Sequence, residues 1–116
     1  IDFEELTWRE QAQLMSRCSI LIGLHGAGLA NMLFMQKGTI VIELRRRDDF
    51  HNNCYFSLAS ALQLNYLYQL CEVNNENIVT QGNDFFVNKV LLEENIKTAL
   101  RMIVMCFPFL YQKRIN

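Results

Sequence analysis

The feature that most constrains this sequence is a short apolar run, Ile20–Ile22, that leads through Gly23 into a glycine-rich turn. Such a run, rich in β-branched residues, is typical of a strand that is buried on both faces of a parallel sheet. Gly26 and Gly28 lack a Cβ, so the backbone there can adopt positive φ angles and approach a ligand closely. An apolar helix is expected at 29–35. The segment therefore predicts a buried strand, a turn and a helix start, an arrangement that can hold an anion.

Helical and strand patterns alternate along the rest of the chain. Thr7 and Glu10 have the spacing of a capping box, and Asn88 is placed to cap a last helix. The other expected segments are a strand end at 1–3, a helix from 8 to about 17, a turn at 36–38, a strand at 39–44, a helix at 55–64, a strand at 66–70, an exposed loop at 74–83, a short edge strand at 85–87 and a helix from 89 to about 104. This alternation predicts an α/β fold, a Rossmann-like three-layer domain with a mostly parallel sheet and helices on both faces.

Apolar residues at helical spacing mark the faces of the helices that should be buried. These residues are Trp8, Ala12, Leu14 and Met15, then Phe56, Leu58, Ala59 and Leu62, and finally Val90, Leu91, Ile96, Leu100 and Ile103. The chain has 116 residues, of which 51% are hydrophobic, so it can form one domain with a real core. We expect His51 on the surface, and Tyr55 and Phe56 in the core or along a groove.

Charge and hydropathy limit the possible partners. The net charge of −1 lacks the basic excess that nucleic-acid-binding domains show, so we expect no nucleic-acid partner. The apolar run 102–111 is far shorter than the roughly 20 residues that span a bilayer, and we interpret it as the buried end of a helix plus a tail. The sequence begins with Ile1 and shows no leader, so we expect a piece of a longer protein whose targeting signal lies outside it.

The cysteines give no metal-binding pattern. The four of them, Cys18, Cys54, Cys71 and Cys106, form no Cys-x-x-Cys pair, and the two histidines do not complete a zinc motif. We favour free thiols that pack as small apolar groups. In an oxidising compartment four cysteines allow three pairings, among which the sequence does not choose.

Two polar segments should meet at the carboxyl edge of the parallel strands, where ligands bind in such sheets. The first is the turn from His25 to Gly28, in which His25 can donate a hydrogen bond to a phosphate oxygen or act as an acid near neutral pH. The turn matches neither the dinucleotide fingerprint nor the P-loop. The second is Glu43, which ends an apolar strand: it either accepts hydrogen bonds from a ribose or pairs with Arg45 or another basic group. The Arg45–Arg47 cluster that follows is either a local turn of mixed charge with Asp48 and Asp49, or a surface that faces phosphate.

The segment from Met15 to Met35, with its His-Gly-Ala-Gly-Leu block, resembles the signature stretch of glycosyltransferase family 61. Gly38–Leu44, with Glu43 next to its last residue, is similar to the next strand of that family. The likeness runs from about Thr7 to Tyr68. One departure is Gln36-Lys37, where many members have a proline, and we expect it to alter only a turn. The family includes protein N-acetylglucosaminyltransferases of the secretory pathway and plant xylosyl- and arabinosyltransferases.

The resemblance implies a GT-B architecture, in which two Rossmann-like domains face a cleft. It implies transfer of a sugar from a nucleotide sugar, often a UDP-sugar, to a protein or glycan hydroxyl with inversion and without a bound metal or other cofactor. Residues 1–116 would then be the C-terminal, donor-binding domain, with the acceptor domain outside this sequence. The resemblance also implies the lumen of the endoplasmic reticulum or Golgi as the location.

The residues expected to bind the donor follow from the turn and the next strand together. They are His25, Gly26, Ala27, Gly28, Leu29 and Glu43, with Asn31 and Arg45 as further candidates. We place no catalytic base in this sequence, because in GT-B enzymes that group often comes from the other domain. The main alternative is a non-catalytic α/β domain of the same family that contacts other proteins. A third class, an NAD-dependent enzyme, is disfavoured by the incomplete dinucleotide fingerprint.

Overall fold

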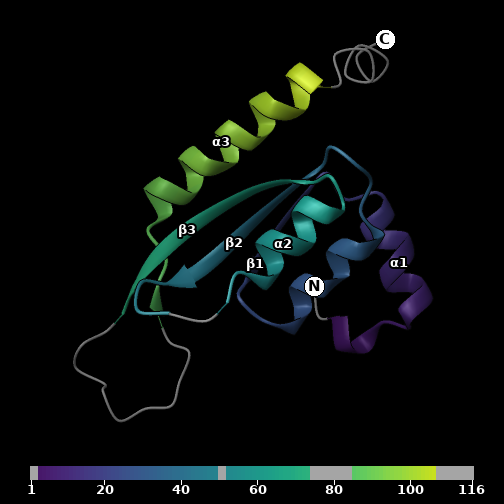
Figure 1. Cartoon of the computed structure of the whole chain (residues 1–116), viewed down its shortest axis with the longest axis horizontal. Coiled ribbons are helices and arrows are strands. Elements are labelled where there is room, and N and C mark those ends of the chain that lie inside the picture. The colour runs from purple at the N-terminus through teal and green to yellow at the C-terminus, as the bar shows by residue number, and fades with distance from the viewer. Residues whose placement is uncertain (1–2, 50–51, 74–84, 107–116) are drawn as a thin grey trace.

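The computed structural model describes residues 3–49, 52–73 and 85–106 (Figure 1). The elements are, in chain order, η1 (Phe3–Glu5), α1 (Trp8–Ser16), β1 (Ile20–Leu24), η2 (Ala27–Phe34), β2 (Ile40–Arg46), α2 (Cys54–Ala61), β3 (Asn65–Val73), β4 (Phe85–Phe86) and α3 (Lys89–Cys106), where η denotes a 3₁₀-helix. The strand order is β1-β2-β3-β4; the first three strands are parallel, and β4 pairs antiparallel with β3. The α/β fold and the mostly parallel sheet are confirmed.

The sheet lies between two layers of helices. One face packs under α1, η2 and α2, and the buried side chains there are Met15, Leu29, Met32, Met35, Val41, Ala59 and Leu64. The other face packs against α3, and its buried side chains are Ile40, Ile42, Leu44, Cys71 and Ala99. Figure 1 shows α3 crossing one side of the sheet and the other helices on the opposite side. Because strand side chains alternate, β2 supplies the centre of both clusters and is buried from Ile40 to Arg45.

Local signals in the sequence set several element ends. The Thr7 side chain accepts a hydrogen bond from the Glu10 amide (3.3 Å), and the Glu10 carboxylate accepts one from the Thr7 amide (2.7 Å), so the capping box is confirmed. Asn88 Oδ1 accepts a hydrogen bond from the Leu91 amide (3.1 Å) at the start of α3. Gly38 has a φ of 82° in the turn before β2, a conformation that favours glycine.

The prediction that β1 is covered on both faces is wrong. β1 is an edge strand of the described sheet, and Ile22 and Leu24 are 40% and 53% exposed. Both side chains lie on the α3 face, where α3 packs over β2 and β3 and leaves the outer strand open. An apolar run favours a strand but does not say how many neighbours the strand has.

The sequence also predicts more buried helix residues than the structure shows. Trp8, Val90, Leu91 and Leu100 are exposed, because each helix buries only a narrow stripe. In α3 that stripe is Leu92, Ile96, Ala99 and Ile103. The expected strand end at 1–3 is wrong at Phe3, which begins η1. The predicted loop at 74–83, His51 and the tail beyond residue 106 lie outside the described residues.

Three of the four cysteines are described as free thiols: Cys18, Cys54 and Cys71. Burial raises the pKa of the Cys18 and Cys71 thiols, which suits the expected packing as small apolar groups. Cys54 is exposed, so the expected packing does not extend to it. Within the described parts of the chain, none of the helices is long and apolar enough to cross a bilayer.

Candidate functional site

The turn after β1 lies at the carboxyl edge of the sheet and is fixed by two backbone hydrogen bonds. The His25 amide donates to the Leu44 carbonyl (3.0 Å), and the Leu29 amide donates to the Gly26 carbonyl (3.0 Å). The helix that follows is a 3₁₀-helix and begins at Ala27, earlier than the sequence suggested. The expectation of positive, left-handed φ angles here is wrong: Gly26 has an extended φ of 168°, and among the described glycines only Gly38, with a φ of 82°, lies in the left-handed region.

Glycines on either side of the turn serve different purposes. A Cβ added at Gly23 would lie 2.9 Å from Cδ2 of Leu29, whose side chain is only 1% exposed. Gly23 therefore lets Leu29 pack down on β1 and draw the turn against the sheet. A Cβ added at Gly28 would meet nothing within 4 Å, so this position faces open space. From the sequence Gly23 is only a strand boundary, and its contact with Leu29 was not predicted.

His25 meets Glu43 across the first two strands. The distance from His25 Nδ1 to Glu43 Oε1 is 2.9 Å, and the parallel register pairs Gly23 with Glu43. The Tyr55 ring and the imidazole of His25 form a T-shaped pair, with the ring centroids 5.0 Å apart. Glu43 lies within β2 rather than at its end and is 1% exposed, because the strand continues to Arg46. The predicted meeting of the two polar segments at this edge is thus observed.

Arg45 continues the series of polar side chains that begins with His25 and Glu43. Its Nε lies 3.4 Å from Glu43 Oε1, its Nη1 donates to Asn53 Oδ1 (2.7 Å), and its Nη2 lies 3.4 Å from Asp49 Oδ2. The alternative in which Glu43 pairs with Arg45 is therefore what the structure shows, and a direct contact of Glu43 with a ribose stays a prediction. Glu43 Oε2 is buried and has no hydrogen-bond partner.

The other two arginines also form ion pairs. Arg46 Nε lies 3.0 Å from Asp48 Oδ1, and Arg47 Nε lies 2.7 Å from Glu72 Oε1 on β3. Arg45 and Arg46 thus pair with the acids of the turn, as one alternative expected, whereas Arg47 pairs across to β3; a role of the cluster in facing phosphate stays a prediction. Asn31, a further candidate, donates to the Gly28 carbonyl (3.1 Å) and so supports the turn. No group of three acidic, histidine or cysteine side chains in the described segments is arranged to hold a metal ion.

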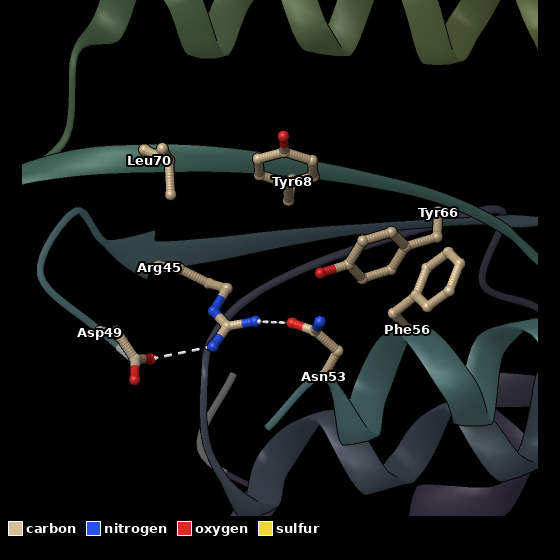
Figure 2. Close-up of a pocket in the computed structure, with 7 residues that line it drawn as sticks. All are labelled: Arg45, Asp49, Asn53, Phe56, Tyr66, Tyr68 and Leu70. Carbon is tan, nitrogen blue, oxygen red and sulfur yellow. Dashed lines mark hydrogen bonds and ion pairs between the residues drawn. The ribbon is translucent and has the colours of Figure 1, made fainter. Parts of the chain in front are cut away.

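A pocket of about 470 Å³ opens beside Arg45 (Figure 2). Its lining residues are Arg45, Asp49, Asn53, Phe56, Tyr66, Tyr68 and Leu70. The Tyr66 hydroxyl points toward Arg45, and the Phe56 ring lies edge-on to Tyr66 at 5.4 Å between centroids. Tyr68 and Phe56 are 60% and 50% exposed, so aromatic surface is open to a ligand.

Only part of this pocket was predictable from the sequence. Phe56 is an expected core or groove residue and Arg45 an expected candidate, but Asp49, Asn53, Tyr66, Tyr68 and Leu70 were not expected there. The available signal was the alternation within β3, which places Tyr66, Tyr68 and Leu70 on one face of the sheet. That face is the one that carries Glu43 and Arg45.

Two tyrosines close to Glu43, Tyr55 and Tyr66, are held in their neutral form. Burial raises the pKa of Tyr66 to about 12, and the negative charge of Glu43 adds to the effect. Burial also raises the pKa of Tyr55. Both phenols can therefore offer hydrogen bonds near neutral pH, but neither is suited to remove a proton from an alcohol there.

Part of the chain is similar to a known family of proteins. Residues 1–42 match the family model of glycosyltransferase 61. The matched segment contains β1, the whole turn from His25 to Gly28 and the first three residues of β2, so it supplies one side of the site. The resemblance to this family of transferase enzymes, stated above on sequence motifs, is thereby confirmed over that segment.

The chain is also similar to individual transferases. It is 35% identical over 65 residues to the EGF domain-specific O-linked N-acetylglucosamine transferase of Gallus gallus, a match that covers 56% of this chain and 12% of that protein. The same protein of Drosophila melanogaster is 35% identical over 66 residues (57% and 12%), and that of Mus musculus is 34% identical over 65 residues (56% and 12%). The match thus spans only about an eighth of these relatives.

Proposed function

We propose that this chain is the donor-binding part of a glycosyltransferase that takes its sugar from a nucleotide sugar, preferably a UDP-sugar. One observation carries the proposal: His25, at a turn open to solvent at the carboxyl edge of a parallel sheet, is held by a buried carboxylate. That turn lies in the segment that matches glycosyltransferase family 61. In sheets of this kind the carboxyl edge is where ligands bind.

The turn would receive the diphosphate of the donor. Backbone amides from Gly26 to Gly28 and the His25 side chain are the groups we assign to it, with Gly28 facing open space, whereas the Leu29 amide already donates to the Gly26 carbonyl. In the reaction, the acceptor oxygen bonds to the anomeric carbon as the bond from that carbon to the diphosphate breaks, which inverts the configuration. Hydrogen-bond donors at the turn would stabilise the charge that develops on the departing diphosphate, and the proposal needs no metal.

The pocket beside Arg45 would receive a ring of the donor. Its exposed aromatic side chains, Tyr68 and Phe56, offer flat apolar surface, and the Asn53 and Asp49 side chains line the same pocket. A volume of about 470 Å³ lies within the range of small-molecule sites, roughly 300–1,000 Å³. The proton of the acceptor alcohol must go to a base outside this set, because the nearby phenols are held neutral.

The architecture and location of the whole protein belong to the same proposal. By analogy with the family, residues 1–116 would be the C-terminal half of a GT-B enzyme, with the acceptor domain outside this sequence. The acceptor would be a protein or glycan hydroxyl, and the site of action the lumen of the secretory pathway. The relatives are named as transferases of N-acetylglucosamine, which makes UDP-N-acetylglucosamine the first donor to test.

The test is calorimetric titration of UDP and UDP-N-acetylglucosamine onto the wild-type chain and two variants. Gly28→Leu would project a side chain into the open space at the turn and should lower the affinity for UDP at least tenfold. Ala61→Leu is the matched control, because it adds a leucine at an exposed position far from the turn. Ala61 is the last residue of α2, and this end of the helix lies toward the amino edge of the parallel strands. The control should bind UDP as the wild type does.

Two results would count against the proposal. Equal UDP affinity in Gly28→Leu and wild type would remove the turn from the site. A wild-type chain that binds neither ligand, although it is folded, would favour the alternative of a non-catalytic domain that contacts other proteins. A full-length transferase that keeps its turnover with Gly28→Leu would also contradict the proposed role of the turn.

A further inference from the structure

The position of Glu43 suggests a role that differs from direct contact with a ligand. Its side chain is 1% exposed, at the centre of the sheet, and its Oε1 lies 2.9 Å from His25 Nδ1 and 3.4 Å from Arg45 Nε. His25 is the more accessible member of the pair, with 22% of its side chain exposed. A ligand at the carboxyl edge therefore reaches His25 more easily than it reaches Glu43.

The unpartnered oxygen of Glu43 adds to this argument. Oε2 is buried without a hydrogen bond, and such an atom lowers the stability of a fold. Buried polar atoms without a hydrogen bond are rare in native proteins, and each needs an explanation. Stability alone explains the carboxylate poorly, and its short contact with His25, at 2.9 Å, points to a role at the turn.

The contact fixes which imidazole nitrogen carries a proton. Glu43 is a carboxylate paired with a guanidinium, and a carboxylate only accepts hydrogen bonds. His25 Nδ1 must therefore be the donor, which makes Nε2 the nitrogen that accepts a proton. Among the described residues, the charged or titratable groups around this pair include Arg45 on β2, Tyr55 on α2 and Tyr66 on β3, and none of these three is an acceptor comparable to the carboxylate.

We infer that Glu43 is a positioning residue, which holds the Nδ1–H form of His25 so that Nε2 meets the diphosphate and takes up a proton from solvent as it binds. The doubly protonated ring then donates from Nδ1 to Glu43 and from Nε2 to a phosphate oxygen. The identity of the ligand rests on the proposed function, whereas the tautomer of His25 is a property of the free protein. Glu43 would thus act on the donor only through His25.

The first experiment reads the tautomer without any ligand. Two-bond ¹H–¹⁵N spectra of the histidine-labelled wild-type chain, above the pH at which free imidazole is neutral, distinguish the two nitrogens of each ring. The variant His51→Gln assigns the remaining signals to His25. We expect the proton on Nδ1 in wild type and a mixture of tautomers in Glu43→Gln, whose amide can either donate or accept. A proton found on Nε2 in wild type would overturn the inference even if Glu43→Gln did not fold.

The second experiment is a double-mutant cycle with UDP as the probe. Glu43→Gln should weaken UDP binding about tenfold when His25 is present, because a charge-assisted contact that orients the ring is lost. In a His25→Ala background the same substitution should change the affinity less than about twofold. An equal loss in both backgrounds would show that Glu43 contacts the ligand itself, as a ribose acceptor would, and would overturn the positioning role.

The third measurement detects the proton. Calorimetric binding of UDP in two buffers with different ionisation enthalpies should show net proton uptake in wild type and none in His25→Ala. Binding without uptake in wild type would refute the proposed action of Nε2. A folded wild-type chain that binds no UDP would overturn the proposed function and the proton uptake with it, while the nitrogen spectra would still decide how Glu43 holds His25.

Discussion

Replacing Gly23 by alanine tests how the turn is held against the sheet. The added Cβ would lie 2.9 Å from Leu29 Cδ2 and 3.5 Å from its Cγ, and Leu29 is 1% exposed among neighbours that fill the space around it. A methyl group forced into a packed site costs about 1–3 kcal/mol. The lower end applies here, because the contact is with the end of a side chain, and because alanine at an extended position restricts the unfolded chain slightly.

Thermal unfolding followed by circular dichroism measures this cost. A loss of about 1 kcal/mol lowers the Tm of a domain of this size by roughly 3–6 °C. Gly28→Ala is the control, because its Cβ would meet nothing within 4 Å, and its Tm should not fall. UDP affinity should also fall in Gly23→Ala, since the turn moves when Leu29 moves.

The double variant Gly23→Ala/Leu29→Ala separates crowding from other effects. Leu29→Ala alone should cost about 2–5 kcal/mol through the cavity that it leaves. With both changes the new methyl group enters space that Leu29 vacated, so the combined loss should be smaller than the sum of the two. Equal Tm values for Gly23→Ala and wild type, or strict additivity in the double variant, would refute the idea that a glycine is needed at position 23 to leave room for the Leu29 side chain.

Three further predictions concern other parts of the molecule. Thr7→Ala should destabilise the chain by about 1 kcal/mol in chemical denaturation, because it removes the hydroxyl that accepts from the Glu10 amide and donates to the Glu10 carboxylate; an unchanged midpoint would contradict this. Tyr68→Ala should weaken UDP-sugar binding about tenfold with little change in Tm, since the ring is 60% exposed in the pocket; equal affinity would remove the ring from the site. Stability should fall between about pH 10 and pH 12, because Tyr66 keeps its proton in the fold up to a pKa of about 12 and loses it earlier when unfolded. Tyr66→Phe should flatten that part of the pH profile, and an identical slope in wild type and variant would exclude Tyr66 as its cause.

The parts of the fold that sequence predicted are those set by neighbours in the chain. The Thr7 and Asn88 caps and the turn at Gly38 depend on groups only a few residues apart, and each is found where it was expected. The order of elements followed from hydrophobic periodicity. Exposure of Ile22 and Leu24 could not follow in the same way, because it depends on which element covers the outer strand.

The sequence predicted two parts of the site, the turn at His25 and the segment around Glu43, but not how the charged side chains of β2 pair. Parallel strands bring their carboxyl ends together, so the meeting of His25 with the Glu43 segment followed from the alternation of elements. The sequence predicts the end of the second strand at Leu44, where the apolar run ends. In the structure Glu43 and Arg45 are two residues apart, share one face of β2 and neutralise each other, which lets the strand continue. Such a pairing is a tertiary fact that propensity does not contain.

The described residues are suited to binding a sugar donor but not to removing a proton from an acceptor. The turn, His25 and the aromatic pocket lie on one side of the sheet, and each is suited to hold a charged or flat part of a donor. The phenols of Tyr55 and Tyr66 have raised pKa values, and Glu43 already accepts from His25 and pairs with Arg45, which leaves these groups unsuited to deprotonate an acceptor. If the proposed function is correct, changes in the turn and the His25–Glu43 pair should therefore alter donor affinity and the departure of the diphosphate, while the group that activates the acceptor must be sought outside this set.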